Sequence, residues 1–280
     1  MSEVKRTTVL VAAFEGWNDA CQSATDVLRH LVATYDSAEV RDIRCDGFYD
    51  YQVARPITCN IQGRRRILWP HTTFYDITVT EELHILAQIA PEPNYRWLEY
   101  CRQSLRIADE FEVNRIITLG AMFADCPHTR PLPVDISDST CTCSMDREYN
   151  GPVGIPTILD DMACKDGYDT TSMWVSIPQY LGADECAQAT MRLMDHLSMV
   201  LGVPLEMGTL PQKSEQWRAK ADALLGCNSD LSDYVHELEH EYDCDTRSID
   251  TPAVETPQAE QLVKEAEEFL RDCGGSPLIG

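Results

Sequence analysis

The sequence predicts an α/β fold, in which a sheet is layered between helices, followed by a helical appendage. Strand-like apolar segments alternate with helical patterns through the first three quarters of the chain, as expected of βα units. The near-continuous apolar run at residues 115–124 suits a central parallel strand that is covered on both faces. From about residue 213 onward the patterns are helical only. We therefore predict two domains, an α/β domain at residues 1–212 and an acidic helical appendage at residues 213–280.

The order of elements in the first domain follows from hydrophobic periodicity and turn residues. The domain begins with a strand at 7–14 and a helix at 19–32, for which Asn18 or Asp19 is a suitable N-cap. A hairpin follows, because Gln62-Gly63 separates two β-rich segments at 57–61 and 65–69. The remaining elements are expected as strands at 82–90, 115–124 and 170–178, helices at 95–111 and 184–202, and a Gly- and Pro-rich loop entering a helix at 149–167.

The appendage is distinguished by its helical periodicity and its charge. Residues 214–280 hold 16 acidic and 5 basic residues, a net charge of −11. Helices are expected at 214–226, 229–243 and 258–272, and the segment at 245–257 is the best candidate for a linker.

Composition argues against several classes of partner. The net charge of −23 opposes binding to nucleic acid, which needs clustered Lys and Arg. No apolar run reaches the roughly 20 residues of a membrane span, and no signal peptide is recognisable, so we expect a cytoplasmic protein. The 12 cysteines show no C-x-x-C spacing, which favours free thiols over disulfides or a zinc ribbon. We expect no cofactor, no membrane contact and no nucleic-acid partner.

A zinc-protease motif, His-Glu-Leu-Glu-His at residues 236–240, occurs in the appendage. On a helical wheel, Tyr234, Val235 and Leu238 share an apolar stripe, whereas His236 and His240 point away from it. A catalytic zinc helix instead turns its histidines into a walled cleft. We therefore reject His236, Glu237 and His240 as a metal site and predict no bound metal.

Polar residues in the loop Pro127–Pro131 are the first candidates for chemistry. This loop follows the expected central strand, so His128 and Arg130 are expected at the carboxyl edge of the sheet, where open α/β folds bind ligands. Arg130 offers a planar fork for a carboxylate or phosphate. The structural alternative is that Arg130 pairs with a core or interface acid and that His128 caps a strand end.

Further candidates lie in other loops that follow strands. Gly151 and Gly154 open a helix whose N-terminal N–H groups could face an anion, although no nucleotide-binding glycine motif is present. Asp19 is either an acid–base group or a helix cap, and we favour the cap. Glu92 and Trp97 complete the set, Glu92 as a catalytic candidate and Trp97 as a ligand contact.

Seven motifs occur in order along the chain: "FEGWNDA", "DGFYDYQVARP", "EPNYRW", "LGAMFADCPHTRP", "YNGPVGIPTIL", "SMWVSIPQY" and "YVHELEHEYD". Together they resemble the bacterial branch of the proteasome assembly chaperone family, second type, over roughly residues 7 to 245. In place of the Pro-His-Tyr usual in that family, this chain has Pro178-Gln179-Tyr180, which removes a potential acid–base histidine.

The resemblance implies a three-layer α/β/α sandwich, similar in architecture to purine nucleoside phosphorylases, with C-terminal helices. It implies a homo-oligomer, with a trimer as the expected number, that interacts with a protein partner such as a proteasome-related assembly and has no established catalytic activity. The alternative function is a small-molecule enzyme of phosphorylase or hydrolase type that binds an anionic ligand at the strand ends.

Overall fold

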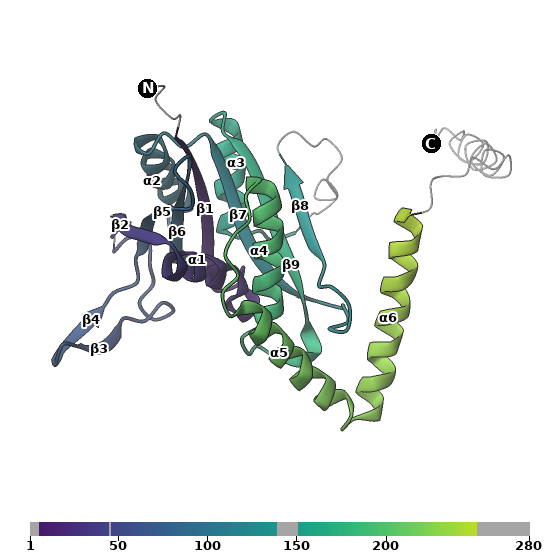
Figure 1. Cartoon of the computed structure of the whole chain (residues 1–280). Helices are drawn as coiled ribbons and strands as arrows, with labels where there is room; N and C mark the ends of the chain where they lie inside the picture. The colour runs from purple at the N-terminus through teal and green to yellow at the C-terminus, as the bar shows by residue number, and fades with distance from the viewer. Residues whose placement is uncertain (1–5, 45, 139–150, 251–280) are drawn as a thin grey trace, which may run out of the picture. The chain divides into compact units, whose positions relative to one another are not determined.

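The computed structural model describes residues 6–44, 46–138 and 151–250. In this part of the chain, seven strands form one sheet in the order β2-β5-β6-β1-β7-β9-β8 (Figure 1). Strands β6, β1, β7 and β9 are parallel, and antiparallel strands flank them on both sides. The strands are β1 (Thr7–Glu15), β2 (Asp36–Ile43), β5 (Thr72–Thr78), β6 (Leu83–Pro91), β7 (Arg115–Ala124), β8 (Val134–Asp138) and β9 (Asp169–Pro178).

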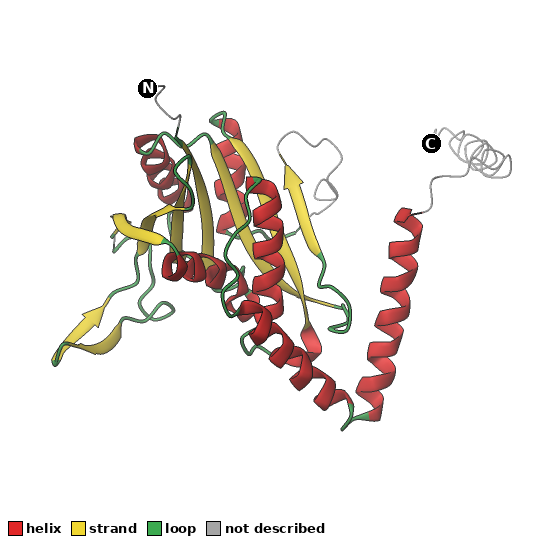
Figure 2. Ribbon diagram, in the orientation of Figure 1, coloured by secondary structure: helices red, strands yellow, loops and turns green. Residues whose placement is uncertain are grey.

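Helices cover both faces of the sheet (Figure 2). On β1, Val9 and Val11 face one core together with α1 and α4, whereas Leu10 and Ala12 face a second core with α2 and α3. This alternation follows from the period of two residues in a strand. It confirms the predicted three-layer α/β/α sandwich. The helices are α1 (Ser23–Thr34), α2 (Trp97–Glu110), α3 (Ile155–Lys165) and α4 (Ala187–Leu201), with short 3₁₀ turns at Ala20–Gln22 and Gln179–Leu181.

Three strands were not predicted from the sequence. β2 and β8 are the outermost strands of the sheet; β2 is mostly exposed and β8 is at most half-buried, so neither shows a continuous apolar segment. In β5, polar and apolar residues follow one another without strict alternation. The predicted strands and helices of the first domain are all present, with ends that differ by a few residues.

The hairpin predicted around Gln62-Gly63 is present as a separate two-stranded ribbon. Strand β3 (Ile57–Ile61) pairs with β4 (Arg64–Leu68) and with no strand of the main sheet. Both turn residues have positive φ, 51° at Gln62 and 74° at Gly63. Such a two-residue turn matches the right-handed twist of its strands.

Two further helices follow the sandwich, α5 (Leu210–Leu225) and α6 (Ser229–Asp250). The chain divides into two compact units, Met1–Leu238 and Glu239–Gly280, whereas the sequence places the change at residue 213, within α5. The predicted linker at 245–257 is wrong in its first part, because α6 continues to Asp250. The third predicted appendage helix, at 258–272, lies outside the described residues. No described helix is both long enough and apolar enough to span a membrane.

Candidate functional site

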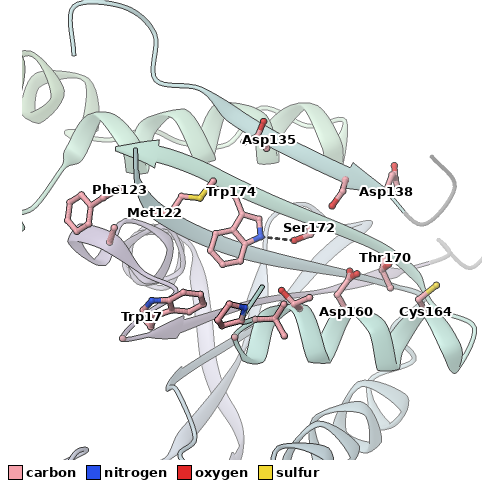
Figure 3. A pocket seen from close by; sticks show the side chains of 17 residues that line it. Trp17, Met122, Phe123, Asp135, Asp138, Asp160, Cys164, Thr170, Ser172 and Trp174 are labelled. Carbon is pink, nitrogen blue, oxygen red and sulfur yellow. Dashed lines mark hydrogen bonds between the residues drawn. The ribbon is translucent and has the colours of Figure 1, made fainter. Parts of the chain in front are cut away.

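A cleft of about 930 Å³ lies on the α3 face of the sheet, between α3 and the outer strand β8 (Figure 3). Its floor is formed by β7 and β9, and one end is bordered by the loop after β1. Apolar side chains of Trp17, Phe123 and Trp174 line it, and the first two are more than two-fifths exposed. Large aromatic side chains left in contact with solvent around a cleft are typical of a binding surface.

The position of Trp174 depends on the glycine beside it. Trp174 on β9 is paired in register with Gly120 on β7, and a Cβ atom at residue 120 would lie 2.5 Å from the indole ring. The indole Nε1–H donates to Ser172 Oγ at 3.0 Å, which fixes the ring along the cleft floor. Gly120 is therefore needed for the shape of the cleft.

Three carboxylates line the cleft, and one of them is ion-paired, because Arg115 Nη2 lies 3.9 Å from Asp138 Oδ2. Asp135 and Asp138 come from β8 and Asp160 from α3, and among the described residues that line the cleft none is Lys, Arg or His. Carboxylates near an anion repel it, and in a cleft they attract a cation over several ångströms. The lining therefore suits a group with apolar and cationic parts, and it opposes the anionic ligand that the sequence suggested for the 149–167 loop.

Of the two candidate glycines, Gly154 borders the cleft and Gly151 does not. A Cβ atom at residue 154 would lie 1.7 Å from Oδ1 of the buried Asn18. The Asn18 amide donates to Glu92 Oε1 at 2.7 Å, and the same oxygen accepts the Ile155 backbone N–H at 3.0 Å. Glu92 thus supplies the negative charge that the N-terminus of α3 favours, and an added anion would compete with it.

Asp19 is buried at the start of α1 and accepts hydrogen bonds from the helix. Its Oδ1 accepts the Ala24 backbone N–H at 2.7 Å, and its Oδ2 accepts the Thr25 hydroxyl and backbone N–H. Burial raises the pKa of Asp19 to about 6, although the hydrogen bonds from Thr25 and Ala24 act in the opposite direction. These are the contacts of a capping carboxylate, and Asp19 is not among the described residues that line the cleft.

His128 is fully buried between the sandwich and α5. Its backbone N–H donates to the Tyr180 hydroxyl at 2.9 Å, and its Nδ1 lies 2.7 Å from the same oxygen. The hydroxyl accepts the backbone N–H, so its own proton can point to Nδ1. The ring proton is then on Nε2, which lies 3.1 Å from Asp222 on α5. Trp217 of α5 contacts the ring edge to face.

The rest of the loop Pro127–Pro131 also contacts α5. Arg218 on α5 donates to the Thr129 carbonyl at 2.7 Å. The Arg130 backbone N–H lies 3.4 Å from the Pro127 carbonyl, and its side chain is half-buried. Neither His128 nor Arg130 lines the cleft within the described structure. The loop is therefore an internal contact between the sandwich and α5, and the cleft is a separate feature.

The remaining candidate groups have structural contacts. Trp97 donates its indole N–H to the Pro93 carbonyl and packs on the core shared by α2 and α3. Burial raises the pKa of the Cys126 thiol, next to the loop, to about 12, so this thiol is protonated at neutral pH and is a poor nucleophile. The histidine missing from the Pro178-Gln179-Tyr180 motif is replaced by Gln179, which donates to Asp125.

In the helix with the zinc-protease motif, the face that was predicted to be buried is confirmed. Val235 and Leu238 are buried, whereas His236 and His240 are exposed. Tyr234 donates to Asp125 Oδ1 at 2.6 Å. In the residues that the structure describes, no group of three or more His, Cys, Asp or Glu side chains is placed to hold a metal ion.

Comparison with known proteins identifies the family. The family model described as "PAC2 family" matches residues 13–225. The chain belongs to the PAC2 family. No curated protein matches it. This membership confirms the resemblance drawn from the seven motifs.

Solved structures of bacterial proteins show the same fold. A PAC2 family protein from Streptomyces avermitilis is 32% identical with a TM-score of 0.76, and the match covers 81% of this chain and 99% of that one. A proteasome-assembly chaperone homologue from Mycobacterium tuberculosis is 30% identical with a TM-score of 0.75, over the same shares of the two chains. An archaeal proteasome activator from Pyrococcus furiosus, 13% identical with a TM-score of 0.63 over 80% of this chain and 96% of that one, shares the fold.

The cleft itself was not predicted from the sequence. Of the predicted site residues, only Gly154 is among the described residues that line the cleft. The aromatic residues Trp17 and Trp174 stood in quoted motifs, but nothing in the sequence placed them together. Asp135 and Asp138 were not found because β8, the strand that carries them, was not predicted.

Proposed function

We propose that this PAC2 family member is a cytoplasmic, chaperone-like interaction protein that works as a homo-oligomer, with three chains as the expected number, and acts on a proteasome-related assembly without catalysis of its own. The observation that carries the proposal is the similarity to the Mycobacterium tuberculosis proteasome-assembly chaperone homologue, which extends over 99% of that chain. Identity of 30% over a whole chain supports a related role.

The contacts of the candidate catalytic groups support a role without chemistry. Asp19 caps α1, Glu92 binds the N-terminus of α3, and His128 links the sandwich to α5. Side chains with such contacts are held by the fold, and none of the three lines the cleft in the described structure. The exposed apolar residues of the cleft and the ribbon instead favour contacts with protein.

An assembly assay tests the proposal. Purified proteasome α and β subunits from the organism that encodes the chain are mixed with and without it, and the formation of complete particles is followed by native gel electrophoresis. We expect faster or more complete assembly with the chain, and no effect from the same chain after heat denaturation. Identical assembly with and without the folded chain would contradict the proposal.

The second candidate is a small-molecule enzyme, and the cleft is the observation that favours it. Its volume of about 930 Å³ is that of a ligand pocket. A thermal-shift screen against phosphate, nucleosides and divalent metals tests this alternative. Stabilisation by one of these compounds that is lost in Trp174→Ala, a change in the cleft lining, would favour the enzyme. Because three carboxylates line the cleft, we expect no shift with phosphate.

A further inference from the structure

The ribbon formed by β3 and β4, which we call the arm (residues 57–69), exposes an unusual set of side chains. Cross-strand pairing places Ile57 opposite Leu68 and Ile61 opposite Arg64, so these residues share one face with Arg66. Every residue from 60 to 69 is exposed, and Ile57 keeps 67% of its surface in contact with solvent. A two-stranded ribbon with apolar residues on its surface is marginally stable alone in water. The arm therefore needs a partner surface.

The arm is also a basic segment in an acidic protein. Arg64, Arg65 and Arg66 are adjacent, whereas the whole chain has a net charge of −23. Among the described residues, no carboxylate forms an ion pair with any of these three arginines, and Arg65 Nε donates a hydrogen bond to the Thr58 hydroxyl at 3.0 Å. The surface that suits the arm must combine apolar side chains with carboxylates.

The cleft described above has this composition. Trp17, Phe123 and Trp174 offer apolar and aromatic contacts, and Asp135 and Asp160, each of which already has an interaction within its own chain, place carboxylates in the lining. Guanidinium groups bind carboxylates in a planar fork and also stack on aromatic rings. The arm and the cleft are thus complementary in both charge and polarity.

The arm cannot enter the cleft of its own chain. It is inserted between β2 and β5, at one edge of the sheet, whereas β8 forms the opposite edge (Figure 1). The cleft floor, β7 and β9, is the fifth and sixth strand counted from β2, so four to five spacings, or roughly 19 to 24 Å at about 4.8 Å each, separate it from that edge, and the arm extends away from the sheet (Figure 1). Contact between arm and cleft therefore requires two chains.

We infer that the arm of one chain docks into the acidic, aromatic cleft of a second copy of the same chain, in a head-to-tail interface. This inference rests on the homo-oligomer in the proposed function and specifies how it is built. Because the two surfaces differ, the interface is heterologous, and repetition of the contact closes a ring when the rotation between copies permits. A ring of three chains meets this condition with three identical contacts.

The test compares three charge-changed forms of the full chain by sedimentation velocity over a range of concentrations. The arm variant is Arg64→Glu/Arg66→Glu, and the matched control is Arg102→Glu/Arg106→Glu, which makes the same change in net charge on the exposed face of α2. We expect the arm variant to dissociate at a concentration on the order of a hundredfold higher than the unmodified chain, because like charges then face each other. The control is expected to assemble as the unmodified chain does.

The third form is the cleft variant, Asp135→Lys/Asp160→Lys, and the decisive experiment mixes it with the arm variant. Alone, it is expected to lose assembly as the arm variant does. When the two variants are mixed, the basic arm of one meets the acidic cleft of the other, and the acidic arm meets the basic cleft, so mixed complexes are expected. Circular dichroism checks that each variant is folded.

Three other outcomes of these sedimentation experiments would overturn the inference. If the unmodified chain assembles and neither variant weakens assembly, the arm-to-cleft contact is wrong while the homo-oligomer stands. If only the arm variant weakens it, the arm binds another surface and the inference is also wrong. A monomeric unmodified chain would overturn both the contact and the homo-oligomer in the proposed function.

A crosslinking measurement covers the case in which a variant does not fold. A photoreactive benzophenone amino acid replaces Gln62 at the tip of the arm. After illumination, peptide mass spectrometry is expected to find crosslinks between residue 62 and cleft residues such as Met122 in covalent dimers. Crosslinks only within single chains, or between two arm tips, would overturn the inference.

Discussion

Replacement of Asp19 by Asn tests whether this buried carboxylate acts as a helix cap that is costly to ionise. The folded pKa is about 6 and the ordinary value is 3.8, with burial as the main cause. Between these two values the folded chain binds more protons than the unfolded chain. The free energy of unfolding therefore falls as pH rises through this range, and this loss is complete above the folded pKa.

The magnitude follows from the two pKa values. The full difference corresponds to about 3 kcal/mol, and the part that lies between pH 5 and pH 7.5 is about 1.4 kcal/mol. In Asp19→Asn this contribution is absent, while the Asn carbonyl can still accept the Ala24 N–H, which Asp19 accepts at 2.7 Å. We therefore expect the stability of Asp19→Asn, relative to the unmodified chain, to improve by about 1.4 kcal/mol from pH 5 to pH 7.5.

Urea denaturation followed by tryptophan fluorescence at both pH values measures this difference. Other titrating groups contribute equally to the two proteins and cancel in the comparison. Asp36→Asn, at an exposed position at the start of β2, is the matched control and is expected to show a much smaller pH dependence of the difference. A difference between Asp19→Asn and the unmodified chain that is the same at pH 5 and pH 7.5 would refute the role assigned to burial of Asp19.

Three further predictions concern His128, Gly154 and the two exposed histidines of α6. His128→Ala is expected to lower the free energy of unfolding by about 3 kcal/mol, because it leaves a cavity and removes contacts with Tyr180 and α5; a change below about 1 kcal/mol in urea denaturation would contradict this. Gly154→Ala is expected to destabilise by about 2 kcal/mol through its clash with Asn18, and a double-mutant cycle with Asn18→Ala should show a coupling of at least about 1 kcal/mol. His236→Ala/His240→Ala is expected to change the free energy of unfolding by less than about 0.5 kcal/mol. Elemental analysis of the untagged protein is expected to find the same metal content with and without this change. Stoichiometric zinc in the unmodified chain that is lost in this variant would contradict the rejection of the metal site.

The sheet core was predictable because its parallel strands are buried on both faces. Residues 115–124 form such a strand, and burial on both faces requires apolar residues at nearly every position, which the sequence shows as a near-continuous apolar segment. The outer strands β2 and β8 have one neighbour each and expose polar residues, so their sequence resembles that of a loop. The buried face of α6 was also predictable, because the helical period alone places Val235 and Leu238 on one face, without reference to tertiary contacts.

The candidate site was less predictable, because it depends on which loops meet. His128 follows a central strand, which suggested a ligand site at the sheet edge, but α5 covers this loop and the histidine is buried by Trp217 and Asp222. The cleft combines Trp17 and Trp174 with carboxylates of β8. These residues are far apart in the sequence, and only the strand order brings them together.

The most direct test of the proposed homo-oligomer is the mass of the unmodified full chain in solution, determined by sedimentation equilibrium at low and high salt. We expect a complex of three chains, each of 31.6 kDa, that dissociates at a higher protein concentration when salt screens the contacts between arginines and carboxylates. A mass of a single chain at every concentration and salt level would contradict the homo-oligomer and the arm-to-cleft contact together.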